Sequence, residues 1–455
     1  MGEKTLYIVH CVDTEGPLYE SLHATFERVK RTFGIELPPS NANLERLRRG
    51  EGVPERIAPL VSEFVSEDRL NYNKDWSMID RMLDELLSGE WRNRYRDDFA
   101  RGHIFSWFVV DHVGYIDNPR RRAHGYHTVF NYYLEKLSEY ECNEDEIHWH
   151  YHPVFFTGEA LKSSNNFSQT NHHIQILCRR ILDHGWFPAA FRPGFHVERS
   201  DINLFLEQWI PFDYGNQAVE EEKNKITDLQ RDLGAGRYGD WRRATTEWEV
   251  YHPDFYDYQK TGSMKRYIAR CLNLNARLRM IDGFEVEKAF RRADSGKRTI
   301  MAFTSHDERE MRPYIDRLYG MVNDVHKRYP EVKVKNDGAL SAMRGALKLE
   351  KGEPVTFDAR FEGCTLSIKT NKPCWGPQPF FCFKTLNGHY IHENLDYHGA
   401  SSWSYTFDED TVILSSIEAI GLATNDNYGN TTVLRKNMQD GGIEDVRILN
   451  NIMSR

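Results

Sequence analysis

Short β-rich runs alternate with helical patterns along the first three quarters of the chain. The expected strands are residues 5–12, 104–110, 147–152, 187–191, 210–214, 246–251 and 299–304. Helical periodicity is clearest at 168–184, which Gly185 follows in a C-cap position, and at 311–325. Strands that alternate with helices form parallel sheets, so seven units predict an α/β fold with a distorted (β/α)7-type barrel.

The pattern changes after Lys348. Residues 1–348 carry the alternation, and the first two strands are separated by a charged, helical insertion near 17–100 that we expect to shape or cover a site. Beyond the linker, strand-like runs dominate at 355–361, 365–370, 380–385, 405–407 and 411–414. We therefore predict a β-sandwich at 352–455. Its aromatic residues Trp375, Trp403 and Tyr405 could stack on sugars, but we favour a structural or interface role.

Charge and composition restrict the partners of the chain. The net charge of -9 and pI near 6.1 argue against a nucleic-acid surface. We read the arginine run 120–122 as a solvated loop, with a site for a substrate phosphate or carboxylate as the alternative. No apolar run reaches membrane-spanning length, no signal peptide is recognised, and the seven cysteines are scattered. These features predict a cytoplasmic protein, and they leave homo-oligomerisation and a peripheral membrane encounter open.

The segment HWHYHP at 148–153 places three histidines on one face of an expected strand. His148, His150 and His152 would point into the barrel, and Trp149 and Tyr151 toward the helices. Catalytic residues of such barrels lie at the carboxyl ends of strands. We therefore predict His150 and His152 as metal ligands and His148 as a supporting or core residue. The alternative is that all three bond to ordinary polar neighbours.

Three further motifs follow expected strands. Asp13 and Glu15 of VDTEG share a face, so one could bind a metal and the other could take a proton, or the pair could cap a helix.

In FRPGFH, Arg192 could orient a carboxylate, and the turn at Phe195 and His196 could present a backbone N–H to an oxyanion. In TSHDE, His306 is a candidate general acid whose tautomer Asp307 could fix. A structural ion pair and a helix N-cap are the respective alternatives. Together the motifs predict one site at the strand ends of the barrel.

These motifs resemble those of the polysaccharide deacetylase superfamily, also called the NodB homology or carbohydrate esterase family 4 group, over roughly residues 5–340. VDTEGP and FRPGFH look most like WbmS-type deacetylases, which are associated with bacterial O-antigen clusters. The family's first motif is usually TFDDGP, with a base followed by a ligand. By order Asp13 would be the base and Glu15 the ligand, but the different spacing lets the roles exchange, so Asp13 is also a candidate ligand.

The family's second motif is usually HxxxHP, which His148 and His152 satisfy, and a variant branch has HxHP, which His150 and His152 satisfy. Position at the strand end favours the variant. The resemblance also assigns Arg192 to the third motif and His306 to the late histidine. It implies zinc or a similar divalent ion, held by two histidines and one carboxylate.

The implied reaction is hydrolysis of an N-acyl group, acetyl or formyl, on an amino sugar of a bacterial surface polysaccharide or of its nucleotide- or lipid-linked precursor. Asp13 would take a proton from water, a backbone N–H near Phe195 would help to hold the oxyanion, and His306 would protonate the amine. The alternatives are a catalytically inactive glycan-binding barrel, an amidohydrolase of a non-sugar amide and, ranked lowest, a non-haem iron oxygenase.

Overall fold

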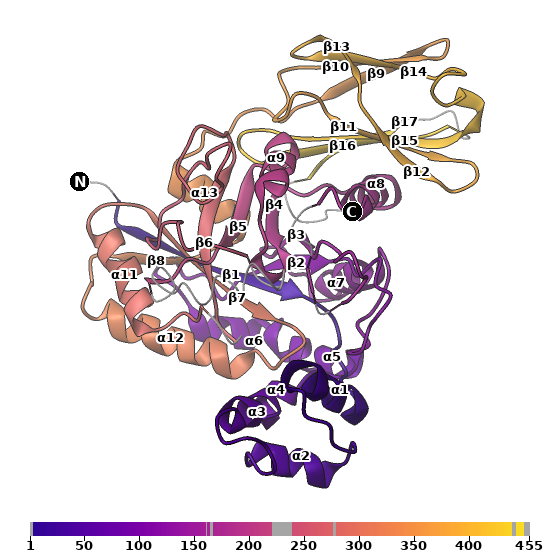
Figure 1. Cartoon of the computed structure of the whole chain (residues 1–455). Helices are drawn as coiled ribbons and strands as arrows, with labels where there is room; N and C mark the ends of the chain where they lie inside the picture. The colour runs from indigo at the N-terminus through magenta and orange to yellow at the C-terminus, as the bar shows by residue number, and fades with distance from the viewer. Residues whose placement is uncertain are drawn as a thin grey trace.

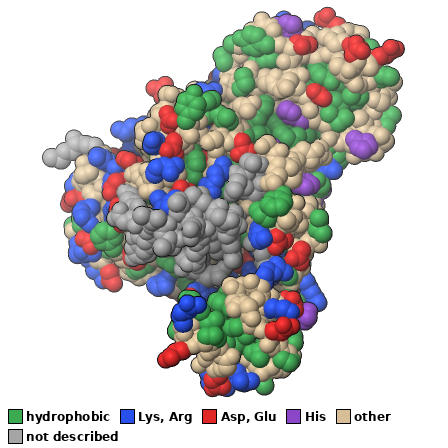
Figure 2. All heavy atoms as spheres, viewed as in Figure 1, with side chains coloured by type: hydrophobic (Ala, Val, Ile, Leu, Met, Phe, Trp, Pro, Cys, Tyr) green, Lys and Arg blue, Asp and Glu red, His purple; other side chains and the backbone are tan. Residues whose placement is uncertain are grey.

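The structure is a computed structural model of the chain, and it describes residues 3–160, 162–163, 167–220, 239–275, 279–438 and 443–449, the last as backbone alone. A barrel with surrounding helices is followed by a C-terminal β region, and a helical lobe projects at the other end (Figure 1). Figure 2 shows this lobe as a separate protrusion.

Seven parallel strands form a closed barrel, as the sequence predicts. In chain order they are β1 (Thr5–Thr14), β2 (Phe105–Val110), β3 (Glu146–Tyr151), β4 (Ala190–Pro193), β5 (Phe212–Asn216), β6 (Tyr267–Asn273) and β7 (Thr299–His306). Each pairs with the next, and β1 closes the ring by pairing with both β7 and β2. An eighth strand, β8 (Lys333–Asn336), pairs with the first half of β1.

The sixth strand lies outside its predicted position at 246–251. In that segment Tyr251 forms only an isolated bridge to Ile268, and Trp248 donates a hydrogen bond to a carbonyl of the helix that precedes β7. The true strand, β6, contains Arg270, which is buried and pairs with both carboxylate oxygens of Glu285 at 2.5 and 2.7 Å. A buried arginine interrupts the apolar pattern, so the sequence did not identify this strand.

Helices cover the outside of the barrel. They are α7 (Thr128–Glu139), α8 (His172–His184), α9 (Ser200–Trp209), α11 (Gly283–Asp294) and α12 (Arg312–His326). A further helix, α13 (Ala339–Leu347), packs against the side chains of the barrel interior. Gly185 ends α8 with a φ of 62°, so the predicted C-cap is confirmed. Leu340 and Met343 of α13 belong to the same apolar cluster as interior residues such as Phe108 and Tyr214. This cluster fills the barrel below the carboxyl ends of the strands. None of the described helices combines the length and apolarity needed to cross a membrane.

The insertion after β1 is helical, as predicted. It contains α1 (Leu22–Phe33), α2 (Asn41–Arg48), α3 (Ala58–Phe64), α4 (Glu67–Leu70), α5 (Trp76–Leu86), α6 (Gly89–Arg92) and the 3-10 turn η1 (Asn93–Tyr95). Phe26, Val29, Leu47 and Val61 form part of a small apolar core of its own. The first four helices therefore make a lobe beside the barrel rather than part of its wall (Figure 1).

The C-terminal region contains two antiparallel sheets. One has the order β13 (Asp396–Gly399), β14 (Ser402–Thr406), β10 (Thr365–Thr370), β9 (Phe357–Glu362). The other has the order β12 (Tyr390–Glu393), β11 (Phe380–Thr385), β15 (Ile417–Asn425), β16 (Thr431–Asn437), β17 (Ile443–Leu449). The predicted strand at 411–414 is wrong, because these residues lead into the 3-10 turn η5 (Leu414–Ser416). The strands β12, β13 and β15 to β17 were not predicted.

The aromatic side chains of this region are structural. Trp403 and Tyr405 are buried in a core shared by the two sheets, and Trp375 donates its indole N–H to the carbonyl of Glu207 at 3.1 Å. The side chain of Asn425 donates to the carbonyls of Pro188 and Trp209, which precede β4 and β5. The β region therefore docks at the amino ends of these strands, away from the end where the candidate site residues lie.

A buried histidine pair makes the stability of the fold depend on pH. His10 lies 2.9 Å from His103 and 2.6 Å from the Ser305 hydroxyl, and burial lowers the pKa of His10 to about 3. Below an unfolded pKa near 6.5, the unfolded chain binds a proton that folded His10 excludes. The free energy of unfolding should therefore fall as pH falls from 6.5 toward 3. Denaturant unfolding of His10→Gln should show a pH slope shallower by about 1.4 kcal/mol per pH unit, whereas the exposed His23→Gln should keep the wild-type slope.

Candidate metal centre and active site

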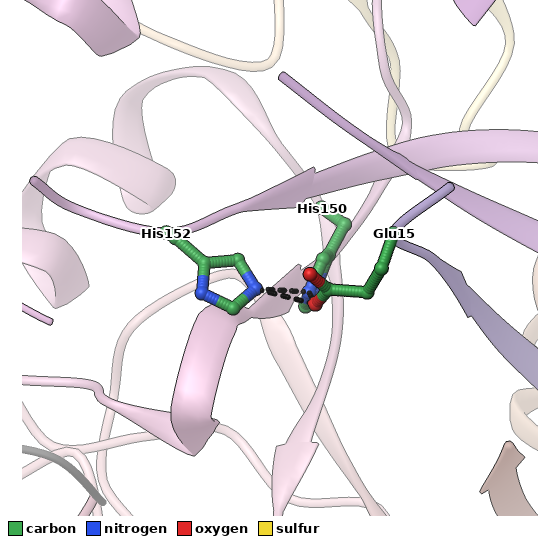
Figure 3. Close-up of side chains that lie close together, drawn as sticks. All are labelled: Glu15, His150 and His152. Carbon is green, nitrogen blue, oxygen red and sulfur yellow. Dashed lines mark hydrogen bonds and ion pairs between the residues drawn. The ribbon is translucent and has the colours of Figure 1, made fainter. Parts of the chain in front are cut away.

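Three side chains converge at the carboxyl ends of β1 and β3 (Figure 3). The Nε2 atom of His152 lies 2.8 Å from Oε1 of Glu15 and 2.9 Å from Nε2 of His150. The distance from His150 Nε2 to the same Glu15 oxygen is 3.5 Å. All three residues are at least nine-tenths buried, so the structure brings together the predicted ligands Glu15, His150 and His152.

The arrangement of these atoms suits a cation. His150 donates its Nδ1–H to the carbonyl of Arg192 at 3.0 Å, which leaves a lone pair on Nε2. A single proton on His152 Nε2 could serve only one of its two close neighbours. Around an ion with bonds of about 2.0–2.1 Å, tetrahedral ligand atoms lie about 3.3 Å apart, which falls within the observed 2.8 to 3.5 Å. Two nitrogens and one oxygen form a donor set that fits zinc or a similar divalent ion.

The second oxygen of Glu15 is held by an arginine. Arg122 donates from Nη1 to Oε2, and His112 donates to the backbone carbonyl of Glu15 at 3.0 Å. Burial alone would raise the pKa of Glu15, but Arg122 and the two site histidines hold that pKa well below its usual range. Glu15 is therefore an anion that presents Oε1 to the histidines.

The solvated-loop interpretation of residues 120–122 is wrong for two of the three arginines. Arg120 and Arg122 are both buried, and Arg120 pairs with Glu20 of the insertion at 2.8 Å. Neither partner could be predicted from local sequence, since Glu15 and Glu20 lie about a hundred residues away.

Asp13 lies 3.7 Å from Nδ1 of His150 but outside the group of three converging side chains. Arg192 binds both of its carboxylate oxygens, from Nε at 2.7 Å and from Nη2 at 3.1 Å. In the strand register Asp13 is aligned with His306 across β1 and β7, and His150 with Arg192 across β3 and β4. The Asp13–Arg192 pair therefore crosses the barrel between strands that are not neighbours. Burial alone would raise the pKa of Asp13, but the Arg192 guanidinium holds it well below its usual range. The geometry thus separates a carboxylate fixed by arginine from one that faces the histidines.

His306 lies on the other side of Asp13. Its Nε2 is 3.7 Å from Oδ2 of Asp13, and its Nδ1 is 3.5 Å from the amide oxygen of Asn275. The expected contact with Asp307 is wrong, since the Asp307 carboxylate accepts the backbone N–H groups of Glu15 and Gly16 instead. Asp307 thus fixes the turn that carries Glu15, and burial raises its pKa to about 7.

The turn after β4 has a strained backbone. Within the 3-10 turn η2 (Gly194–His196), Phe195 and His196 have φ angles of 51° and 55°, which non-glycine residues rarely adopt. The Phe195 ring packs edge-on against His152 with centroids 4.8 Å apart. His196 is buried, and burial holds its pKa well below its usual value, so its imidazole is neutral. The predicted oxyanion turn therefore lies directly against a candidate ligand.

Gly194 permits this close packing. A Cβ atom at position 194 would lie 2.4 Å from Cγ of His152 and 2.8 Å from its Cα. Gly194→Ala should therefore displace the imidazole and weaken binding of a divalent ion by tenfold or more, measured by zinc titration against a chromogenic chelator. The control is Gly320→Ala in α12, where a Cβ meets nothing within 4 Å and zinc affinity should stay unchanged. Equal affinity of the two variants would contradict this packing role.

His148 serves a different purpose, as expected of a supporting or core residue. It is fully buried and lies 2.9 Å from the Glu146 carboxylate, which also accepts the backbone N–H of Leu340 at 2.7 Å. Trp149 and Tyr151 stack on each other on the outer face of β3, with centroids 5.7 Å apart. The alternating directions predicted for this strand are confirmed, and His148 lies outside the group at the strand end.

A cavity of about 400 Å³ opens beside these side chains. Asp13, Glu15, His150, His152 and His306 line its inner end. The insertion supplies part of its outer wall, namely Glu63, Ser66, Asp68, Arg69 and Tyr72. The insertion thus shapes the cavity, as expected, although its individual lining residues carry no motif in the sequence.

No family model, curated protein or solved structure matches the chain. The side chains of the cavity indicate the chemistry that this protein can perform. These provide a candidate metal centre, an arginine-bound carboxylate and a partly exposed histidine within one pocket.

Proposed function

We propose that this protein is a metal-dependent hydrolase that removes an acetyl or formyl group from the nitrogen of an amino sugar. The supporting observation is the convergence of Glu15, His150 and His152 beside an Asp13–Arg192 pair, at the inner end of one cavity. The resemblance of the motifs to polysaccharide deacetylases gives the substrate class. On that basis the substrate is a saccharide of a bacterial surface polysaccharide, or its nucleotide- or lipid-linked precursor in the cytoplasm.

Glu15, His150 and His152 would hold the ion, zinc in this proposal, which when bound supplies Lewis-acid polarisation of an acyl oxygen and a more acidic water. Asp13 accepts the proton of the attacking water. Arg192 fixes the orientation of Asp13 through two hydrogen bonds and keeps it ionised. The acceptor is therefore in place before the substrate arrives, with no rearrangement required.

His306 donates a proton to the departing amine. Its side chain is one-fifth exposed, whereas that of Asp13 is 1% exposed, so His306 can exchange protons with solvent between turnovers. The backbone of the strained turn at Phe195 and His196 borders the same space and would face the developing oxyanion. Each residue thus performs one step of an amide hydrolysis.

Two alternatives keep the same pocket. An inactive glycan-binding barrel would hold sugars without turnover, and an amidohydrolase would accept a non-sugar amide. An iron oxygenase would leave the Asp13–Arg192 pair and His306 without a role, which disfavours it.

Release of acetate or formate tests the proposal. Purified protein with added zinc should release acetate or formate from N-acylated amino sugars. Chelator treatment should nearly abolish this release, and added zinc should restore it. Binding of the sugars without acid release would favour the inactive barrel. Release from simple non-sugar amides alone would favour the amidohydrolase.

A further inference from the structure

The insertion is fastened to the loop after β7, at the mouth of the cavity. The backbone N–H of Asn73 donates to the carbonyl of Glu308 at 2.7 Å, and its side chain donates to the carbonyl of Asp307 at 2.7 Å. Arg309 donates to the carbonyls of Asp68 at 2.6 Å and Arg69 at 3.2 Å. The insertion therefore forms a fixed wall opposite the metal centre.

The lining of the cavity is rich in arginine, and one of these arginines, Arg69, belongs to the insertion. The cavity lining contains Arg69, Arg120, Arg122, Arg279 and Arg309. Apart from Asp13 and Glu15, its carboxylates are Glu63, Asp68 and Glu308. With Asp13 and Glu15 included, the five arginines face five carboxylates. A divalent ion at the inner end would therefore leave an excess of positive charge, which favours a negatively charged ligand.

Two of these arginines keep charge available for a ligand. The hydrogen bonds of Arg309 go to carbonyl oxygens, and its Nε lies 3.9 Å from the Glu308 carboxylate, beyond hydrogen-bond distance. Arg69 pairs with Glu63, whose side chain is 63% exposed, so a ligand can compete with a weak surface ion pair. Tyr72 supports the wall, with the guanidinium carbon of Arg309 4.3 Å from the centre of its ring.

Several buried nitrogens of the lining have no hydrogen-bond partner among the residues that the structure describes. They are Nε of Arg122, Nδ2 of Asn275 and Nδ1 of His196, and each residue is more than nine-tenths buried. A buried donor without a partner is costly, and such atoms in a cavity usually meet a ligand or water. Oε2 of Glu308 is buried too, has no hydrogen-bond partner in the described part of the chain, and could accept a hydroxyl proton. The pattern fits a sugar that carries an oxyanion.

We propose that the substrate sugar carries an oxyanion, a phosphate ester or a carboxylate, which binds between Arg122, Arg309 and Arg69. This inference rests on the proposed function, since it places the acyl group at the Glu15–His150–His152 centre and the anion at the insertion wall. Arginine binds both kinds of oxyanion through paired N–H donors. A neutral N-acetyl sugar fills only part of the site and binds weakly.

Calorimetric titration of the full chain tests this. The probes are N-acetylglucosamine 1-phosphate, N-acetylglucosaminuronic acid and neutral N-acetylglucosamine, each with chelator-treated and zinc-loaded protein. At least one anionic probe should bind tenfold or more tightly than the neutral sugar in both forms. The tighter of the two anionic probes identifies the source as phosphate or carboxylate.

Variants connect the binding to the wall. Arg309→Gln and Arg69→Glu should each weaken the anionic probe by about tenfold or more, because a charge-assisted contact is lost or repelled. Arg49→Gln, an exposed arginine outside the cavity, is the control and should leave affinity unchanged. Because Arg309 also bonds to the insertion backbone, Arg69→Glu gives a second test that leaves those bonds intact.

Equal affinity for charged and neutral sugars would overturn the inference, as would wild-type affinity in both variants. Anion binding that requires zinc and ignores both substitutions would place the anion on the ion and overturn it too. Binding to chelator-treated protein does not depend on hydrolysis. If the anionic probes bind no better than the neutral sugar but acetate or formate is released, the anion site is refuted and the proposed function stands. If the anionic probes bind as expected but no acetate or formate is released, the anion site stands and the proposed function is refuted.

Discussion

Replacing Asp13 with asparagine should lower acyl release by about a thousandfold while the fold and the bound ion are retained. Asparagine has nearly the same shape and can still accept a hydrogen bond from Arg192, but it cannot take the proton of the attacking water. General-base catalysis typically contributes 10²–10⁴-fold. The measurements are the rate of acetate release, metal content and the midpoint of thermal unfolding.

The matched control is Asp324→Asn, at a carboxylate that is 77% exposed on α12 and should not affect the rate. A wild-type rate for Asp13→Asn would remove Asp13 from the reaction. Loss of the ion from Asp13→Asn would instead show that Asp13 is a metal ligand. That is the alternative in which Asp13 and Glu15 of the DTEGP motif exchange roles. The two outcomes are distinguished by metal content alone.

Arg192→Met should destabilise the fold by about 3–5 kcal/mol, because it leaves the buried Asp13 carboxylate without its counter-charge. Arg192 is itself fully buried and also donates to the carbonyl of Tyr214 at 2.6 Å. Urea unfolding at pH 7 measures the loss. The double variant with Asp13→Asn should be more stable than the Arg192→Met single variant, since the uncompensated charge is gone.

The control for this pair is Arg49→Met, which breaks the exposed ion pair with Glu51 and should leave the urea midpoint of unfolding unchanged. A loss of under 1 kcal/mol for Arg192→Met would show that Asp13 is hydrated or protonated in the native protein. That result would also weaken the proposal that Asp13 is an ionised base.

The sequence predicted the inner half of the site because local periodicity determines it. Alternation along β3 places the histidines on one face and Trp149 and Tyr151 on the other. The four motifs lie at one edge because each follows the carboxyl end of a parallel strand. Register then distinguishes His150, which is level with Arg192, from His148, which lies a repeat deeper beside Glu146. Such features depend on residues close together in sequence or on general properties of barrels.

The outer half depends on contacts between distant segments, which no local pattern encodes. Arg122 meets Glu15 from a separate loop, and Arg309 meets the insertion some 240 residues away in the chain. Both arginines occur in charged stretches that resemble solvated surface. For the same reason β6 was missed, since its buried Arg270 is compensated by Glu285 on a following helix.

Metal content by inductively coupled plasma mass spectrometry tests the central claim most directly. Wild-type protein should carry, or take up from added zinc, about one divalent ion per chain. His152→Ala and Glu15→Ala should both lose it, and His306→Gln, outside the group of ligands, should keep it. A wild-type protein that holds no ion and takes up none from zinc, cobalt or manganese would contradict the account. So would an ion retained in both His152→Ala and Glu15→Ala.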